Sequence, residues 1–171
     1  LTLNHEKDKW GMQYSPYAYF DEHLIVLRKD HSPMYVNQKT FAELVDFINK
    51  FPHYLIGSNA GLPIVGGSIL NHHHFQGGKY DFPIEKAQVI HKIKRKRMMI
   101  EVLDWPLAAI RIVGNNENSI LDMANAIFEY WLKYENKDLN ILAKTDVDHN
   151  TVTPIVKLDG ASYNFYMIFR N

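Results

Sequence analysis

Apolar residues recur at helical spacing in two stretches of the chain, each preceded by a residue type that caps helices. The first stretch covers residues 40–51, where Thr40 and Glu43 match the pattern of a capping box. The second begins at Ser119, with Asp122 as the acidic residue of its first turn. The predicted buried faces of these helices consist of Phe41, Leu44, Val45 and Ile48 in the first, and Ile120, Ala124, Ile127, Phe128 and Trp131 in the second.

Elsewhere, apolar residues alternate with polar ones, as they do in strands that are buried on one face. Two short strands are predicted at residues 17–20 and 23–27, joined near Asp21 and Glu22. The dipeptide Asp159-Gly160 is typical of hairpin turns and separates two longer runs. Further strands are predicted at residues 53–59, 86–96, 98–105, 107–114, 150–158 and 162–170. Strands that outnumber helices and join through short turns predict an α+β domain with a mainly antiparallel sheet.

The composition excludes several classes of protein. The chain has 171 residues, which is enough for one well-buried core, so we expect a single domain. Basic and acidic residues number 19 each, and this balance provides no overall field that would attract nucleic acid or an anionic membrane. No apolar run has the length of a membrane span, no signal peptide is recognisable, and cysteine is absent, which fits a cytoplasmic protein. Because the chain starts without methionine, we expect residues 1–171 to be part of a longer protein.

The stretch GGSILNHHHFQGG, residues 66–78, contains three consecutive histidines. If residues 69–76 are extended, side chains alternate between the two faces of the strand. His72, His74 and Gln76 then share one face, and His73 shares the other with Phe75. The triple histidine is therefore better described as the pattern His-x-His-x-Gln.

This pattern provides the groups that phosphoryl transfer requires. A neutral imidazole attacks phosphorus well if an acceptor holds its other ring nitrogen. The amide of Gln76 and backbone amides near Gly66, Gly67 and Ser68 are candidate donors to phosphate oxygens. From residue types alone, a metal site or a surface location for the histidines is about equally compatible, and the glycines also suit simple turns.

The surrounding motifs resemble a known family. Residues 51–78 closely resemble the active-site region of the type II (bacterial) galactose-1-phosphate uridylyltransferases, which are relatives of the histidine-triad superfamily. That family typically has His-Asp-His-Phe-Gln at residues 72–76. The resemblance covers most of the chain from about Met12 and extends through the motifs DFPIEKA, DWPLAAIRIVG, DHNTVTPIVK and the terminal FRN. It implies a histidine-triad-like catalytic domain.

The resemblance also implies a reaction and its residues. In that family a histidine attacks the α-phosphorus of UDP-glucose, holds the uridylyl group covalently, and passes it to galactose 1-phosphate. By motif position the nucleophile corresponds to His74, His72 supports the site, and Gln76 donates to a phosphate oxygen. The substrate-binding residues expected from the same motifs are Asn59, His149 and Asn150. The glycine loop, which consists of Gly66, Gly67 and Ser68, is expected to bind substrate as well.

Two departures from the family pattern qualify these expectations. His73 replaces the usual aspartate, but because it is predicted to face away from His74, we expect little effect on catalysis. The zinc site of the type I branch uses cysteines, which this chain lacks, so we expect no catalytic metal or other cofactor. Arg111 lies on an otherwise apolar strand, where it either pairs with a buried acid or faces phosphate.

The sequence therefore predicts a cytoplasmic uridylyltransferase of galactose metabolism. UDP-glucose and galactose 1-phosphate are the expected partners, a homodimer is compatible, and nucleic acid and membrane are not expected. The alternatives are a nucleotide hydrolase or phosphorylase on the same scaffold, or a non-catalytic module that binds metal or nucleotide. Gln76, in the place of a third histidine, argues against the hydrolase.

Overall fold

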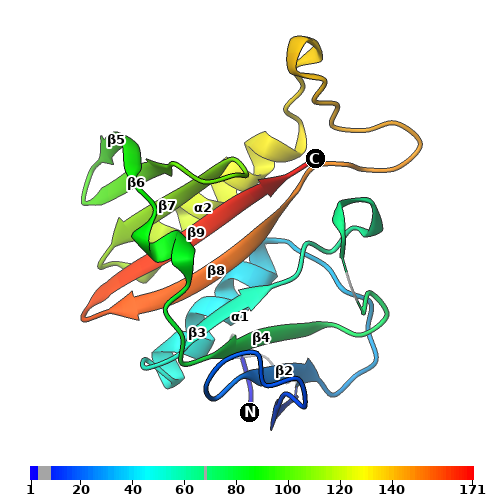
Figure 1. Cartoon of the computed structure of the whole chain (residues 1–171), viewed down its shortest axis with the longest axis vertical. Coiled ribbons are helices and arrows are strands. Elements are labelled where there is room, and N and C mark those ends of the chain that lie inside the picture. The colour runs from blue at the N-terminus through cyan, green and yellow to red at the C-terminus, as the bar shows by residue number, and fades with distance from the viewer. Residues whose placement is uncertain (4–8, 68) are drawn as a thin grey trace.

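In the part of the chain that the structure describes, nine strands form one sheet in which every pair of neighbours runs antiparallel, in the order β1-β2-β4-β3-β8-β9-β7-β6-β5 (Figure 1). The computed structural model describes residues 1–3, 9–67 and 69–171. The strands are β1 (Trp10–Tyr14), β2 (Leu24–Arg28), β3 (Leu55–Ser58), β4 (His74–Gly78), β5 (Val89–Arg95), β6 (Met98–Leu103), β7 (Ala109–Gly114), β8 (Thr151–Asp159) and β9 (Ser162–Arg170). The predicted α+β class with a mainly antiparallel sheet is confirmed.

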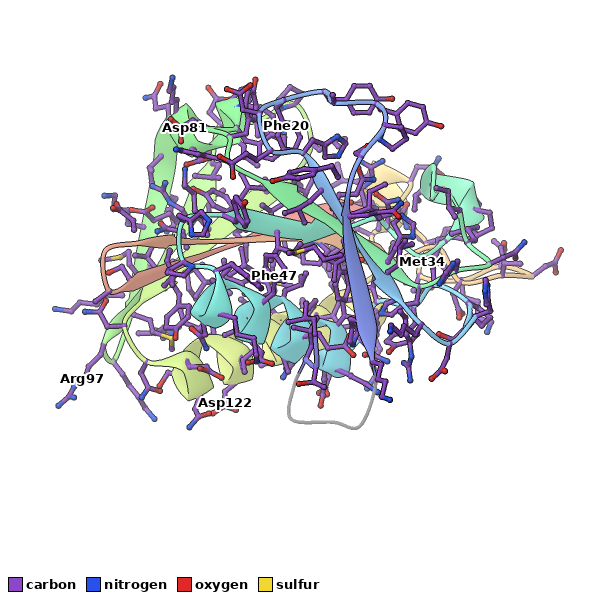
Figure 2. The ribbon with its side chains drawn as sticks, turned by 90° about the horizontal axis from the view of Figure 1, so that it is seen from below. Phe20, Met34, Phe47, Asp81, Arg97 and Asp122 are labelled. Atoms are coloured by element: carbon purple, nitrogen blue, oxygen red, sulfur yellow. The ribbon has the colours of Figure 1, made fainter. Side chains whose placement is uncertain are left out.

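Two helices, α1 (Gln38–Lys50) and α2 (Glu117–Leu132), cover one face of the sheet (Figure 2). The predicted apolar face of α1 is fully buried, and α2 buries Ile120, Ala124 and Phe128 in the same core. Figure 2 shows Phe47 on the helix side of the sheet and Phe20 and Asp81 on the other side. In the described part of the chain, neither helix is long and apolar enough to cross a membrane. The face opposite the helices is therefore the one left for a functional site.

Both helices have their N-terminal cap three residues earlier than predicted. Asn37 caps α1, where its side-chain oxygen accepts hydrogen bonds from the backbone N–H groups of Lys39 and Thr40. Asn116 caps α2 in the same way, through the N–H of Ser119. The predicted caps at Thr40 and Ser119 are wrong because each of these residues already lies inside the first turn, where its own N–H donates to the side-chain oxygen of the capping asparagine.

Two strand predictions also need correction. Residues 17–20 do not form a strand, and the strand that precedes β2 and pairs with it is β1. Ala18 and Glu22 adopt left-handed φ angles of 42° and 53°, which break an extended run. Residues 69–73 are not strand either, because β4 begins at His74. The hairpin of β8 and β9 is confirmed, with Gly160 in the left-handed region at φ 57°.

Strand β4 lies between β2 and β3 and contributes to the core on its helix side. Phe75 is fully buried and stacks on Trp10 with ring centroids 5.0 Å apart. The ring of His73, just before the strand, contacts the same Trp10 ring at 5.5 Å and stacks on Tyr35 at 3.9 Å. His73 and Phe75 therefore share the inner face, as the alternation predicted.

The His73 ring meets the carboxylate of Glu43 from α1 inside this core. Their closest atoms, Nε2 and Oε2, are 3.5 Å apart, and both side chains have no exposed surface. Neither ring nitrogen and neither carboxylate oxygen has a hydrogen-bond partner among the described residues. Each polar group therefore depends on the other for compensation of its lost hydration.

Replacing His73 by aspartate tests this account of the core. The His73→Asp variant puts a second carboxylate beside Glu43 and removes its basic neighbour. We expect the free energy of unfolding to fall by about 3 kcal/mol or more, measured by urea denaturation. Adding Glu43→Gln leaves a single carboxyl group in the core and should restore part of the loss. Equal stability of the unchanged chain and His73→Asp would contradict the buried pair.

Candidate active site

The hydrogen bond made by one ring nitrogen of His74 determines the role of the other. His74 is the first residue of β4, and its Nδ1 lies 2.8 Å from the backbone oxygen of His72. A carbonyl oxygen only accepts hydrogen bonds, so Nδ1 must carry the hydrogen. In the neutral ring this leaves the lone pair on Nε2. The local backbone thus holds the His74 ring with this lone pair in a fixed direction.

Burial keeps this imidazole in its neutral form. The side chain lies among packed groups, and His74 as a whole is 1% exposed. Burial is the largest influence and lowers the pKa of His74 below its usual 6.5, and the nearby His73 and His72 lower it further. The hydrogen bond to the His72 carbonyl opposes this shift. Near pH 7 the lone pair on Nε2 is therefore available.

Asn59, which follows β3 directly, covers the reactive nitrogen. Its Nδ2 lies 3.3 Å from His74 Nε2, where an amide N–H donates to the lone pair. Asn59 and His74 were both predicted site residues, and the structure brings them together. Any group that is to contact Nε2 of His74 must therefore first displace the Asn59 amide.

Gln76 lies two residues after His74 on the same face of β4 and opposite Gly57 of β3. Its Oε1 is 3.1 Å from Nε2 of His23. His23 is 3% exposed and precedes β2, which pairs with β4. Sequence reasoning assigned His23 no role. The contact crosses 53 residues of chain, so only the pairing of β2 with β4 reveals it.

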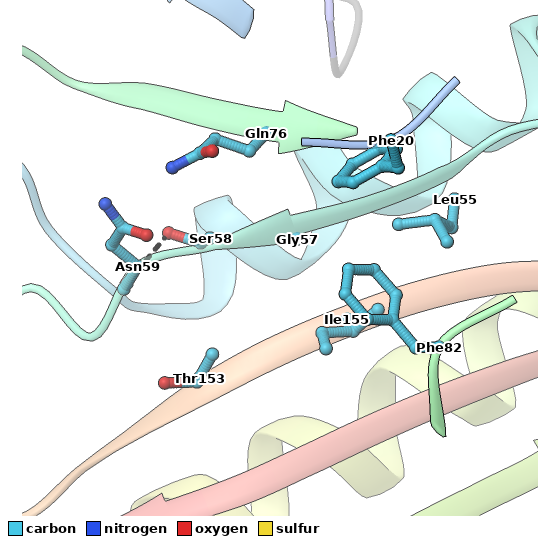
Figure 3. Close-up of a pocket in the computed structure, with 9 residues that line it drawn as sticks. All are labelled: Phe20, Leu55, Gly57, Ser58, Asn59, Gln76, Phe82, Thr153 and Ile155. Atoms are coloured by element: carbon cyan, nitrogen blue, oxygen red, sulfur yellow. Dashed lines mark hydrogen bonds between the residues drawn. The ribbon is translucent and has the colours of Figure 1, made fainter. Parts of the chain in front are cut away.

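A pocket of about 180 Å³ opens beside Asn59 and Gln76 (Figure 3). One part is apolar, with the rings of Phe20 and Phe82 meeting edge to face at 5.8 Å. The other part carries amides and hydroxyls. The residues that line the pocket are Phe20, Leu55, Gly57, Ser58, Asn59, Gln76, Phe82, Thr153 and Ile155. This division suits a ligand with a flat ring at one end and an anionic group at the other.

His72 does not continue the strand. It lies in a bend, its Nε2 donates to the backbone oxygen of Arg28 at 2.6 Å, and its ring packs on His31 at 4.5 Å. The expectation that His72 shares an extended face with His74 and Gln76 assumed a strand over residues 69–76. Because β4 begins only at His74, His72 lies outside the strand. What His72 contributes to His74 in this structure is its carbonyl oxygen. A role for its imidazole stays a prediction.

The glycine loop has its own internal hydrogen bonds. The N–H of Gly66 donates to Pro63 O at 3.1 Å, and that of Gly67 donates to Leu62 O at 3.0 Å. In this conformation the loop offers neither N–H to a phosphate. Ser68 lies outside the described residues. Phosphate binding by the two glycines stays a prediction that requires the turn to open.

His149 and Asn150 lie beside the C-terminal end of α2. The Asn150 amide is buried and donates to the carbonyl oxygens of Trp131 and Tyr134 at 2.7 and 2.9 Å. His149 shares a hydrogen bond of 2.8 Å with the Thr145 hydroxyl. Neither residue lines the pocket described above, and their binding to substrate stays a prediction.

Of the two alternatives for Arg111, pairing with a buried acid is the one that the structure shows. Its guanidinium bonds the Glu101 carboxylate, with Nη2–Oε2 at 2.6 Å and Nε–Oε2 at 2.8 Å. Glu101 is 7% exposed. Burial raises the pKa of its carboxyl, but the hydrogen bonds and charges of Arg111 and Lys92 together outweigh burial and hold this pKa below its usual range. Among residues 1–3, 9–67 and 69–171, no three His, Asp or Glu side chains gather as a metal site.

The fold and the site together define an α+β protein whose sheet presents a neutral, oriented histidine beside amide donors. A family model described as "Domain of unknown function (DUF4922)" matches residues 3–79. A galactose-1-phosphate uridylyltransferase from Butyrivibrio fibrisolvens is 46% identical over 94% of this chain and 42% of its own length. Proteins of the same name from Fusobacterium nucleatum and Bacillus subtilis are 39% and 42% identical over 100% and 97% of this chain.

By sequence, the chain is similar over nearly its whole length to proteins named galactose-1-phosphate uridylyltransferase, which confirms the resemblance predicted from its motifs. It spans only 33–42% of the lengths of these three relatives. A solved structure of a DUF4931 family protein from Bacillus cereus superposes with a TM-score of 0.57 at 12% identity. The match covers 99% of this chain and 85% of that one. That likeness shows a shared fold.

Titration of His74 tests the electrostatics of the site. Burial disfavours the charged ring, so we expect its protonation midpoint, followed by NMR of the ring protons, to lie below 6.5. The lowered pKa stabilises the folded state fully above pH 6.5, and this contribution is lost as pH falls through the midpoint. Stability should therefore decline more steeply on acidification in the unchanged chain than in His74→Ala. A midpoint above 6.5 would contradict the burial argument.

Proposed function

We propose that the chain carries the nucleotidyl-transfer site of a UDP-glucose–hexose-1-phosphate uridylyltransferase. The observation that carries the proposal is the orientation of His74, whose Nδ1–H is bound to the His72 carbonyl and whose Nε2 faces Asn59 at the pocket. The names of the relatives support the choice of galactose 1-phosphate and a uridylyl group.

In the first step, the lone pair of His74 Nε2 attacks the α-phosphorus of UDP-glucose. A P–N bond forms, and the bond from this phosphorus to the bridging oxygen breaks. Glucose 1-phosphate leaves with the electron pair. The hydrogen on Nδ1 stays in place, and its bond to the His72 carbonyl stabilises the positive ring of the uridylyl-histidine.

In the second step, a phosphate oxygen of galactose 1-phosphate attacks the same phosphorus. The P–N bond breaks, its electrons return to His74 Nε2, and UDP-galactose leaves. Amide N–H groups of Gln76 and Asn59, near the pocket edge, donate to the oxygens of the transferring group. The apolar part of the pocket, with Phe20 and Phe82, suits the flat uracil ring.

Two expectations accompany this proposal. A homodimer and a cytoplasmic location both stay predictions for this chain.

The covalent intermediate gives the most direct test. After incubation with UDP-glucose near neutral pH, we expect the intact mass of the chain to rise by one uridylyl group. His74→Ala removes the nucleophile and should show no adduct. His53→Ala, which changes an exposed histidine outside the pocket, is the matched control and should keep the adduct.

Each other outcome has a definite meaning. An adduct on His74→Ala would show that another residue is the nucleophile. No adduct on the folded, unchanged chain would contradict the proposal for this chain. Steady release of UMP without galactose 1-phosphate would indicate a hydrolase instead. Binding of UDP-glucose without adduct or turnover would indicate a non-catalytic nucleotide-binding module.

A further inference from the structure

A second buried histidine touches the site, and the mechanism above gives it no role. His23 lies just before β2 and is 3% exposed. Its Nε2 is 3.1 Å from Oε1 of Gln76, the residue expected to donate to the transferring phosphate. Its ring is held by Phe20 at 4.5 Å and by Tyr19 at 5.5 Å between centroids. The imidazole therefore has a fixed position against one end of the Gln76 amide.

The position of the Gln76 side chain does not determine which end of its amide, the oxygen or the NH₂ group, faces the pocket. The oxygen and the NH₂ group of an amide are similar in size, but one accepts hydrogen bonds and the other donates them. Phosphate oxygens only accept. If the amide rotates by half a turn about its last bond, Gln76 presents an acceptor to the phosphate and repels it. A neighbour must therefore select between the two orientations.

His23 has the chemistry to make this selection. With a hydrogen on Nε2 it donates to Oε1 and leaves the Gln76 NH₂ group directed away from it. Figure 3 shows this NH₂ group on the side of the pocket where Asn59 lies. The other tautomer would place a lone pair of His23 against Oε1. Nδ1 has no hydrogen-bond partner among the described residues in either tautomer, so the contact with Oε1 decides between the two.

We propose that His23 is a positioning residue that donates its Nε2–H to Gln76 and keeps the Gln76 NH₂ group aimed at the transferring phosphoryl group. The proposal rests on the uridylyl transfer proposed above. His23 touches Gln76 rather than the reacting atoms, so its whole effect on rate passes through that amide.

A double-mutant cycle tests this dependence. The rate of adduct formation at saturating UDP-glucose is measured for the unchanged chain, His23→Leu, Gln76→Ala and the double variant. We expect His23→Leu to lower the rate about tenfold or more. In the Gln76→Ala background the same substitution should lower it no further. His53→Leu, at the exposed histidine outside the pocket, should leave the rate unchanged.

The cycle separates positioning from a structural role and from failure of the proposed function. If His23→Leu slows Gln76→Ala by the same factor as the unchanged chain, His23 acts on folding or elsewhere and the inference is overturned. Unfolding midpoints of all four chains show whether stability follows rate. If the unchanged chain forms no adduct, the proposed function itself is contradicted, and this result does not depend on any His23 variant.

Direct observation of the ring provides a readout that does not depend on activity. Long-range ¹H–¹⁵N correlation distinguishes the two tautomers of His23, which is assigned by its absence in His23→Leu. A hydrogen on Nε2, together with a shift of the Gln76 side-chain NH₂ signals in His23→Leu, supports the inference. A ring with its only hydrogen on Nδ1 overturns it, because Gln76 would then donate to His23 and present oxygen to the pocket.

Discussion

Strand β4 is hydrogen-bonded along both edges, and its register determines at once which side chains build the core and which build the site. Phe75 lies opposite Val26 of β2 and Ser58 of β3. A shift of one residue would turn Phe75 toward the pocket and Gln76 into the helix-covered core. Burying an amide there without partners is costly, so the packing of the core enforces the geometry of the site.

The same register explains why the site depends on side chains from distant parts of the chain. β2 brings His23 to one edge of β4, and β3 brings Asn59 to the other. His74 and Gln76 between them are both groups with an ambiguous polarity, an imidazole with two tautomers and an amide with two orientations. A backbone carbonyl settles the first ambiguity, and in our proposal a neighbouring histidine settles the second.

Local patterns were sufficient to predict most of the elements. The helical spacing of Phe41, Leu44 and Ile48 located α1, and Asp159-Gly160 located the hairpin of β8 and β9. The errors arose where local signals compete. Residues 17–20 have aromatic side chains that favour strands, yet the left-handed φ angle of Ala18 breaks the extended run, as that of Glu22 does just after it. The caps were misplaced because asparagine serves as well as the serine or threonine that the patterns offered.

Only the part of the candidate site that belongs to a recognisable motif could be predicted from the sequence. His74 and Gln76 follow from the spacing in residues 72–76, and the resemblance added Asn59. Glu43 and His23 could not be found in this way, because a glutamate on a helix and a histidine before a strand are ordinary by themselves. Their partners are set by how α1 packs on the sheet and how β2 pairs in it. Such tertiary pairs leave no periodic signal in a single sequence.

The lining of the pocket bears on the choice between transfer and hydrolysis. Its polar groups are the amides of Asn59 and Gln76 and the hydroxyls of Ser58 and Thr153, which bind a phosphate without taking up a proton at neutral pH. Water becomes an effective nucleophile when a base removes its proton. The phosphate of a sugar 1-phosphate is already an anion and needs no such base. In the transfer that we propose, a pocket lined by neutral donors therefore favours a phosphate over water as the acceptor of the uridylyl group.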